Sequence, residues 1–243
     1  MSLPLLVRFE DAQVLVVEKP AGMHAAPLRA GEGGTLLERV IERYPEVAGV
    51  PGIKSVEPGL LHRLDRETSG LVAIARSAAA FAALREIAAR GGMRKEYLAA
   101  CARPADGEAI EAGAVLRVAS RFAPYGSGRR MVRVVLADES RGKLLRNATP
   151  DSYSTEAEII RRGPAALLLR VGLDRGFRHQ VRAHLSFLGF PILGDLLYGT
   201  PAPPGAVDRL YLHASRLQFE HPVTGARVSV ESPLPREFAA LFE

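Results

Sequence analysis

Short apolar segments bounded by turn residues are the feature that most limits the fold of this chain. Seven of these segments have the β-branched or alternating composition of strands, and only two or three helical patterns lie among them. The segments are residues 14–17, 71–75, 95–102, 114–120, 131–137, 155–160 and 165–173. The sequence therefore predicts an α+β fold with a mixed, mostly antiparallel sheet flanked by a few helices and loops.

Capping residues mark two of the helices. Thr35 stands three residues before Glu38, the spacing of a capping box, at the start of a helix that Pro45 ends. Ser77 can cap an alanine-rich helix that ends at Gly91. A third helical pattern covers residues 177–189.

At 243 residues the globular chain fits one large domain or two small lobes. We assign residues 1–243 to one domain, with residues 1–13 as an N-terminal extension. At 47% hydrophobic residues the chain can bury a substantial core. It contains neither an apolar run of about 18 residues nor a secretory signal, so we expect a cytoplasmic protein without a membrane partner. We expect a monomer. The lone cysteine, Cys101, lies in an apolar strand-like run and is interpreted as a core thiol.

The stretch "LLHRLDRETSGL", residues 60–71, places Asp65 between Arg63 and Arg66. Guanidinium groups favour the charged form of a neighbouring carboxyl group and do not release a proton themselves. Asp65 is therefore either a nucleophile or a member of a structural salt bridge, and its position alone favours the salt bridge.

Other chemistries have little support in the sequence. His179 and His184 are five residues apart and would diverge by about 140° on a helix, which disfavours a metal site formed with His62 and Asp65. Phosphate-binding loops, dinucleotide fingerprints and GxSxG elbows are absent, and Ser69 fits a turn residue. The sequence predicts no metal and no nucleotide cofactor.

The string "HRLDRETSGL" at 62–71 resembles the active-site motif of the RluA family of RNA pseudouridine synthases. Four further segments resemble family motifs in the same order, and together they cover about residues 14–235. They are "VVEKPAGM" at 16–23, "RKEYLA" at 94–99, "HQVRAHLSFLGFPILGDLLYG" at 179–199 and "LHASRLQFEHP" at 212–222.

This resemblance implies the pseudouridine synthase fold and the isomerisation of uridines in rRNA or tRNA without a cofactor. It implies that Asp65 is the nucleophile, that Tyr97 lies against the target base and that Arg182 is the partner of the aspartate. Arg63 would hold the flipped nucleotide or replace it in the helix. Attack at C6 of the base and at C1′ of the sugar both remain open. A non-catalytic RNA-binding relative is the alternative.

Two departures from the family accompany this resemblance. Phe177 stands where the family usually has an arginine, so Arg175 or Arg178 would have to supply that charge. Larger members carry an N-terminal S4 domain, and we expect none here, because the first catalytic-domain strand begins by about Val14.

Positive charge is concentrated in residues 117–146. The chain has a formal net charge of +5 and a pI of about 9.6, which suits a polyanionic partner. Residues 117–146 contain eight basic and two acidic residues, with Gly126 and Gly128 among them. This segment is either a solvated basic loop or a mobile arm that closes over RNA. The predicted RNA-binding residues are Arg63, Arg66, Arg129, Arg130, Arg133 and Arg178.

Overall fold

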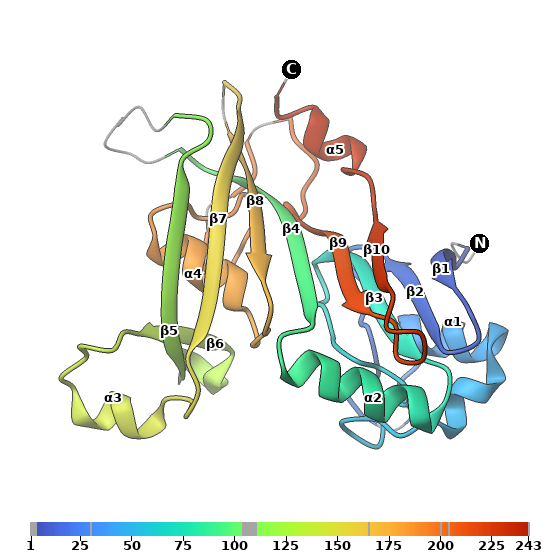
Figure 1. Ribbon diagram of the computed structural model, residues 1–243. Coiled ribbons are helices and arrows are strands. Elements are labelled where there is room, and N and C mark those ends of the chain that lie inside the picture. Colours follow the sequence, from blue (N-terminus) through green and yellow to red (C-terminus); the bar gives the residue numbers. More distant parts are fainter. Residues whose placement is uncertain are drawn as a thin grey trace. The chain divides into compact units, whose positions relative to one another are not determined.

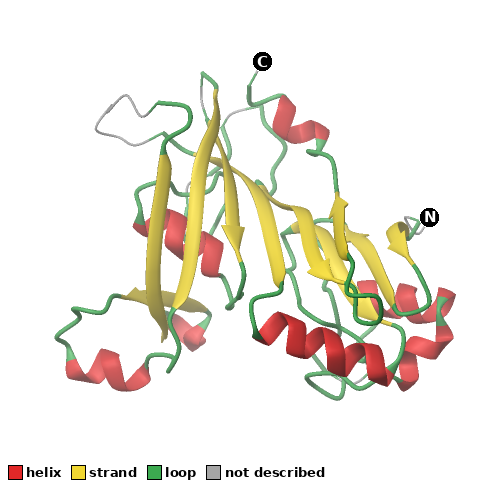
Figure 2. Cartoon of the chain, in the orientation of Figure 1, coloured by secondary structure: helices red, strands yellow, loops and turns green. Residues whose placement is uncertain are grey.

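A computed structural model describes residues 4–29, 31–103, 111–164, 166–199, 201–203 and 205–242 (Figure 1). The chain forms two compact units. The first comprises Met1–Lys95 and His213–Pro233, and the second comprises Glu96–Leu212 and Leu234–Glu243. Both units are rich in strands (Figure 2).

The first unit contains a mixed sheet in the order β1-β2-β3-β9-β10. Its strands are β1 (Leu6–Glu10), β2 (Val14–Lys19), β3 (Ser69–Ala75), β9 (Leu212–Glu220) and β10 (Arg227–Glu231). The β3–β9 pair is parallel, and the other pairs are antiparallel. β2 and β3 are almost entirely buried, as their continuous apolar runs predict.

Two helices of this unit begin at the predicted caps. The Thr35 side chain accepts from the Glu38 amide at the start of α1 (Leu36–Arg43), and Pro45 opens the short 3-10 helix η1 (Pro45–Gly49). The Ser77 side chain accepts from the amide of Ala80 at the start of α2 (Ala78–Ala89). α2 packs on β3 through Ala80, Leu84 and Ile87, which are buried with the apolar residues of β2, β3 and β9.

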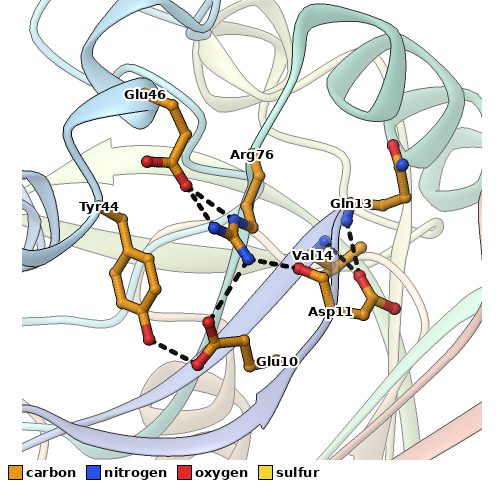
Figure 3. Close-up of polar contacts among 7 residues, drawn as sticks. All are labelled: Glu10, Asp11, Gln13, Val14, Tyr44, Glu46 and Arg76. Atoms are coloured by element: carbon orange, nitrogen blue, oxygen red, sulfur yellow. Dashed lines mark hydrogen bonds and ion pairs between the residues drawn. The ribbon is translucent and has the colours of Figure 1, made fainter.

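An arginine after β3 joins three parts of the first unit (Figure 3). Arg76 donates to Glu46 at 2.6 and 2.8 Å, to the carbonyl oxygen of Asp11 at 2.6 Å and to Glu10 at 3.5 Å. Its guanidinium lies 5.1 Å from the ring centre of Tyr44, whose hydroxyl donates to Glu10. Glu10, Asp11, Glu46 and Arg76 line a cavity of about 550 Å³. The hydrogen bonds within this cluster stabilise the fold around β1 and α1.

The second unit contains strands in the order β4-β8-β7-β5-β6. They are β4 (Met93–Cys101), which begins in the first unit, β5 (Val115–Tyr125), β6 (Met131–Val135), β7 (Tyr153–Arg162) and β8 (Leu167–Leu173). β7 pairs antiparallel with β8 and β5, and β5 pairs antiparallel with β6. The helices are η2 (Ser127–Arg129), α3 (Gly142–Asn147), α4 (Gln180–Phe187) and α5 (Arg236–Ala239), and α4 packs on β6 and β7.

The fold class predicted from the sequence is confirmed, and three local predictions were wrong. β1 occupies part of the segment expected to be an extension, residues 1–13, of which the first three lie outside the described residues. The described residues form five α-helices rather than two or three. The helix expected over 177–189 is shorter at both ends. Ala165, predicted to open a strand, lies outside the described residues, and the single-domain assignment stays a prediction.

Candidate active site

Asp65 lies on the short loop that leads into β3. The amide of Leu61 donates to the carbonyl oxygen of Ala73 at 3.2 Å, so the loop begins against its own strand. The amide of Thr68 donates to the carbonyl oxygen of Asp65 at 3.1 Å and closes a β-turn. Leu64 and Thr68 are buried, whereas Asp65 is half-buried. The turn is thus anchored on both sides of the aspartate.

A buried lysine fastens this turn to the segment after β2. The Lys19 ammonium is fully buried and donates to the carbonyl oxygens of Arg66 at 2.9 Å, Pro20 at 2.8 Å and Met23 at 2.7 Å. Arg66 and Gly22 also exchange two hydrogen bonds, at 2.9 and 3.0 Å. A buried ammonium is costly unless its donors are satisfied. These bonds therefore fix the residue that follows the aspartate.

The two arginines beside Asp65 point their charges to the unit's surface. Arg63 donates from Nη1 to Glu57 at 2.6 Å, and this Glu57 carboxylate is only 3% exposed. Arg66 lies 3.6 Å from Glu67. The Arg63 and Arg66 side chains are 42% and 59% exposed, so both can meet an anionic partner while Glu57 orients the first of them.

His62 has a structural hydrogen bond. Its Nε2 accepts from the amide of Ala73 at 3.2 Å. Burial, together with the nearby Lys95 ammonium, lowers the pKa of His62 to about 3, so the ring is neutral and carries its proton on Nδ1. In the described part of the chain, the buried Nδ1 has no hydrogen-bond partner. A neutral ring bonded to the backbone favours a structural role for His62 over acid–base catalysis.

A chain of buried polar groups holds the start of β3. Ser69 Oγ lies 2.9 Å from Nδ1 of His213, and Nε2 of that histidine lies 3.0 Å from Oγ of Ser232. Gly70 has a φ of +115°, and a Cβ there would lie 2.3 Å from the carbonyl oxygen of Ala214. Only glycine permits this approach of the backbones. The motif's serine and glycine are thus explained by β3–β9 pairing, and Ser69 lies in β3 rather than in the turn expected for it.

Arg182 forms a buried, bidentate ion pair in the second unit. Its Nε and Nη2 each lie 2.7 Å from a carboxylate oxygen of Asp195, and the guanidinium lies 5.3 Å from the ring centre of Tyr198. Burial opposes ionisation of Asp195, but Arg182 and the amides of Leu197 and Tyr198 outweigh it and lower the pKa of Asp195. Sequence reasoning missed Asp195, although it lies within the quoted segment 179–199.

Hydrogen bonds beneath α4 position the helix that carries Arg182. Gln180 donates to the carbonyl oxygen of Ser154 at 2.9 Å and to the hydroxyl of Thr155 at 3.0 Å. His184 lies 2.8 Å from the hydroxyls of Ser120 and Thr155. Burial lowers the pKa of His184 to about 4, so this ring is neutral at pH 7. These contacts give Gln180 a supporting role at the start of the helix that carries Arg182.

Arg178 precedes α4, so it does not share a helical face with Arg182. The helix begins at Gln180, because His179 takes a left-handed φ of +57°. Arg178 donates from Nη2 to the carbonyl oxygens of Arg129 at 2.9 Å and Met131 at 3.2 Å. The guanidinium of this predicted RNA-binding residue thus contacts the turn between β5 and β6.

Phe177 belongs to an aromatic cluster. Its ring stacks on Phe122 with a centroid distance of 5.2 Å and an angle of 7°, and it lies 5.1 Å from Tyr153. Arg175 pairs with Asp151 at 2.8 Å and lies 5.4 Å from the ring centre of Tyr153. The phenylalanine at this position therefore packs inward, and the arginine two residues earlier stays on the surface.

The basic segment 117–146 is a β5–β6 hairpin followed by α3, rather than a loop. Gly126, with a φ of +77°, lies in its turn. Two of its arginines are paired with acids: Arg117 with Glu156 at 2.9 Å and Arg141 with Glu139 at 2.5 Å. Most of the remaining positive charge lies on the hairpin, and its mobility stays a prediction.

Tyr97 lies in the second unit, where its side chain in β4 is 8% exposed. Asp65 lies in the first unit, and Arg182 lies in the second. The predicted pairing of Asp65 with Arg182 and the predicted place of Tyr97 against the base therefore stay predictions. Cys101 is fully buried, and burial raises the pKa of its thiol, as expected of a core residue.

Two features are absent from the described ranges. There, no three His, Cys, Asp or Glu side chains are grouped so that they could hold a metal ion. None of the helices in the same ranges has the length and apolar character needed to span a membrane.

Comparison with known families identifies the chain's relatives. Residues 13–187 match the family model described as RNA pseudouridylate synthase. The chain belongs to this family. As an RNA pseudouridine synthase, it isomerises uridine to pseudouridine in RNA, and the resemblance found in the five motifs is confirmed.

Curated relatives and solved structures agree with this assignment. The synthase is 32% identical to "Ribosomal large subunit pseudouridine synthase D" of Xanthomonas campestris over 99% of this chain and 69% of the relative. It is 30% identical to the protein of the same name from Pseudomonas aeruginosa, over 98% and 70%. Human RNA Pseudouridylate Synthase Domain Containing 1 has the same fold, with a TM-score of 0.69 and 22% identity over 95% of this chain and 83% of that one.

Proposed function

We propose that this synthase isomerises uridines in large-subunit ribosomal RNA, with Asp65 as the nucleophile. The observation that carries the proposal is the turn bearing Asp65, which Lys19 fastens on one side and the Ser69–His213 contact on the other. Such anchoring fits a carboxylate that must meet one atom of its substrate. The ribosomal target is inferred from the relatives named above.

The reaction exchanges one bond to the sugar for another. The bond between N1 and C1′ breaks, the uracil turns, and a new bond forms between C5 and C1′, while a proton leaves C5 and N1 gains one. The oxidation level does not change, so the proposal includes no cofactor. Asp65 divides this exchange into easier steps by forming a covalent bond to the substrate, at C6 of the base or at C1′.

The remaining residues receive the target nucleotide. A stacked uridine hides its reacting atoms, so it must leave the helix at a cost of a few kcal/mol. In the proposal, the Tyr97 ring receives the flipped base and its hydroxyl assists proton transfer at C5. Arg182, held by Asp195, keeps the nucleophile charged, and Arg63, oriented by Glu57, contacts the displaced strand. A ribosomal substrate places the enzyme in the cytoplasm.

Tritium release from large-subunit rRNA labelled as [5-³H]uridine tests the proposal. The parent should release tritium, and rRNA purified from cells lacking this protein should be a better substrate than rRNA that is already modified. The alternative, a non-catalytic RNA-binding relative, predicts binding without release. Release from tRNA alone would reassign the substrate but leave the chemistry in place.

A further inference from the structure

The β5–β6 hairpin presents an aromatic side chain next to an arginine. Tyr125, the last residue of β5, is 45% exposed, and the guanidinium carbon of Arg133 lies 4.1 Å from the centre of its ring. The strand register pairs Ala123 with Arg133 and Tyr125 with Met131. Tyr125 and Arg133 are therefore diagonal neighbours on one face of the hairpin.

The opposite face of the hairpin is anchored. Phe122 and Val132 lie in a buried apolar cluster with Ala183 of α4. The amide of Val132 donates to the hydroxyl of Tyr198 at 2.6 Å, and the Arg182 guanidinium lies over that same tyrosine ring. Packing and hydrogen bonding thus connect the hairpin to the helix that carries Arg182, while the face with Tyr125 is directed away from this cluster.

The hairpin is also strongly positive. Residues 115–137 contain five arginines and no acidic residue. Arg117 is paired with Glu156, but within the described ranges no acidic side chain forms an ion pair with Arg129, Arg130 or Arg133. Arg129 and Arg130 are exposed in the turn beside Tyr125. Cations without acidic partners, one of them over the Tyr125 ring, suit a polyanion that also carries planar groups.

We propose that Tyr125 and Arg133 form a stacking site for an unpaired base of the RNA substrate, and that Arg129 and Arg130 bind the adjoining phosphates. An aromatic ring and a guanidinium plane beside a cationic track are the usual means of binding single-stranded nucleic acid. Bases within a duplex are already stacked and cannot use such a site. This inference rests on the proposed function, because it assigns a feature of the RNA that the synthase selects.

The test compares two RNA probes of equal length, a stem–loop with 2-aminopurine at one loop position at a time and a fully paired duplex. Stacking on Tyr125 should quench the fluorescence of at least one loop position on binding the parent chain. Tyr125→Ala should abolish that quenching and weaken stem–loop binding by about fivefold to a hundredfold, the effect of losing one stacked base. Tyr125→Phe should keep both, since it keeps the ring.

Charge must be separated from stacking. Arg117→Ala is the control, because it removes one cation from the same hairpin without touching Tyr125. It should weaken binding of the stem–loop and of the duplex equally. Arg133→Ala should weaken stem–loop binding more than duplex binding. Parent-like quenching in Tyr125→Ala, or equal losses on both probes in Tyr125→Ala and Arg133→Ala, would overturn the proposal. Thermal unfolding checks each variant, and Tyr125→Leu replaces Tyr125→Ala if the latter does not fold. The fluorescence assay measures binding and needs no turnover. If the parent quenches the probe but releases no tritium from rRNA, the proposed substrate is refuted and the proposed stacking site still stands.

Discussion

Replacing Asp195 with asparagine should destabilise the protein strongly, because it removes one charge from a buried pair. The Arg182 and Asp195 side chains are 8% and 0% exposed, and two bonds of 2.7 Å join them. Removing one partner of such a pair leaves the other uncompensated at about 3–5 kcal/mol. Asparagine keeps an oxygen that can accept from the amides of Leu197 and Tyr198, so the loss reports chiefly on the ion pair.

Urea and thermal unfolding of the parent and of Asp195→Asn measure this loss. A cost of about 3–5 kcal/mol corresponds to a melting temperature about 6–20 °C lower for a chain of this size. The pKa of Asp195 is lower in the folded state than in the unfolded state, where it is about 3.9. The charged carboxylate therefore stabilises the fold at pH values above the unfolded pKa. This stabilisation is lost as the pH falls through the lowered pKa of the folded state. The difference between parent and variant should be constant above about pH 4 and shrink below it.

The double variant Arg182→Met/Asp195→Asn is the control, because it removes both charges from the interior. It should recover part of the stability that Asp195→Asn loses, since removing both charges leaves neither of them uncompensated in the interior. A loss under about 1 kcal/mol in Asp195→Asn would refute the reasoning, because that is the range of an exposed pair.

Three further predictions concern the same framework. Arg182→Ala should lower tritium release at least about a hundredfold, and Arg182→Lys should rescue poorly because a point charge cannot replace a bidentate fork. As the pH decreases from about 6.5 to 4, the free energy of unfolding of the parent relative to His184→Gln should fall by about 1.4 kcal/mol per pH unit. The reason is that burial lowers the pKa of His184 to about 4, so in this range only the unfolded ring gains a proton. A pH-independent difference would contradict this. Gly70→Ala should cost about 3 kcal/mol or more, since its Cβ meets the Ala214 backbone, whereas the control Gly91→Ala, with φ +81° and open space, should cost about 1–2. Equal unfolding midpoints would contradict the clash.

Local signals in the sequence predicted the elements that depend on local physics. The side chains of Thr35 and Ser77 cap their helices as expected, and continuous apolar runs became the buried strands β2 and β3. β1 was missed because its burial only alternates between half-buried and exposed and its residues include two charges. The start of α4 was misplaced because histidine seldom adopts the positive φ that His179 has.

Contacts distant along the chain could not be predicted from the sequence. Asp65 was found through its motif, but the Lys19 bond to Arg66 spans 47 residues and the Ser69–His213 contact spans 144. No periodicity relates such positions. Asp195 was missed for the same reason, since a loop carboxylate has no repeating pattern to mark it. The sequence left open whether the basic segment is a solvated loop or a mobile arm, and it did not indicate the hairpin whose turn contains Gly126.

Tritium release by Asp65→Asn tests the central claim most directly. The replacement is nearly isosteric and leaves the bonds of the Asp65 carbonyl oxygen and of Lys19 in place, so RNA binding should persist, since most of its energy comes from phosphate contacts. The parent should release tritium from [5-³H]uridine rRNA, and Asp65→Asn should bind the same RNA while releasing none that can be measured above background. Turnover within about tenfold of the parent would show that Asp65 is not the nucleophile.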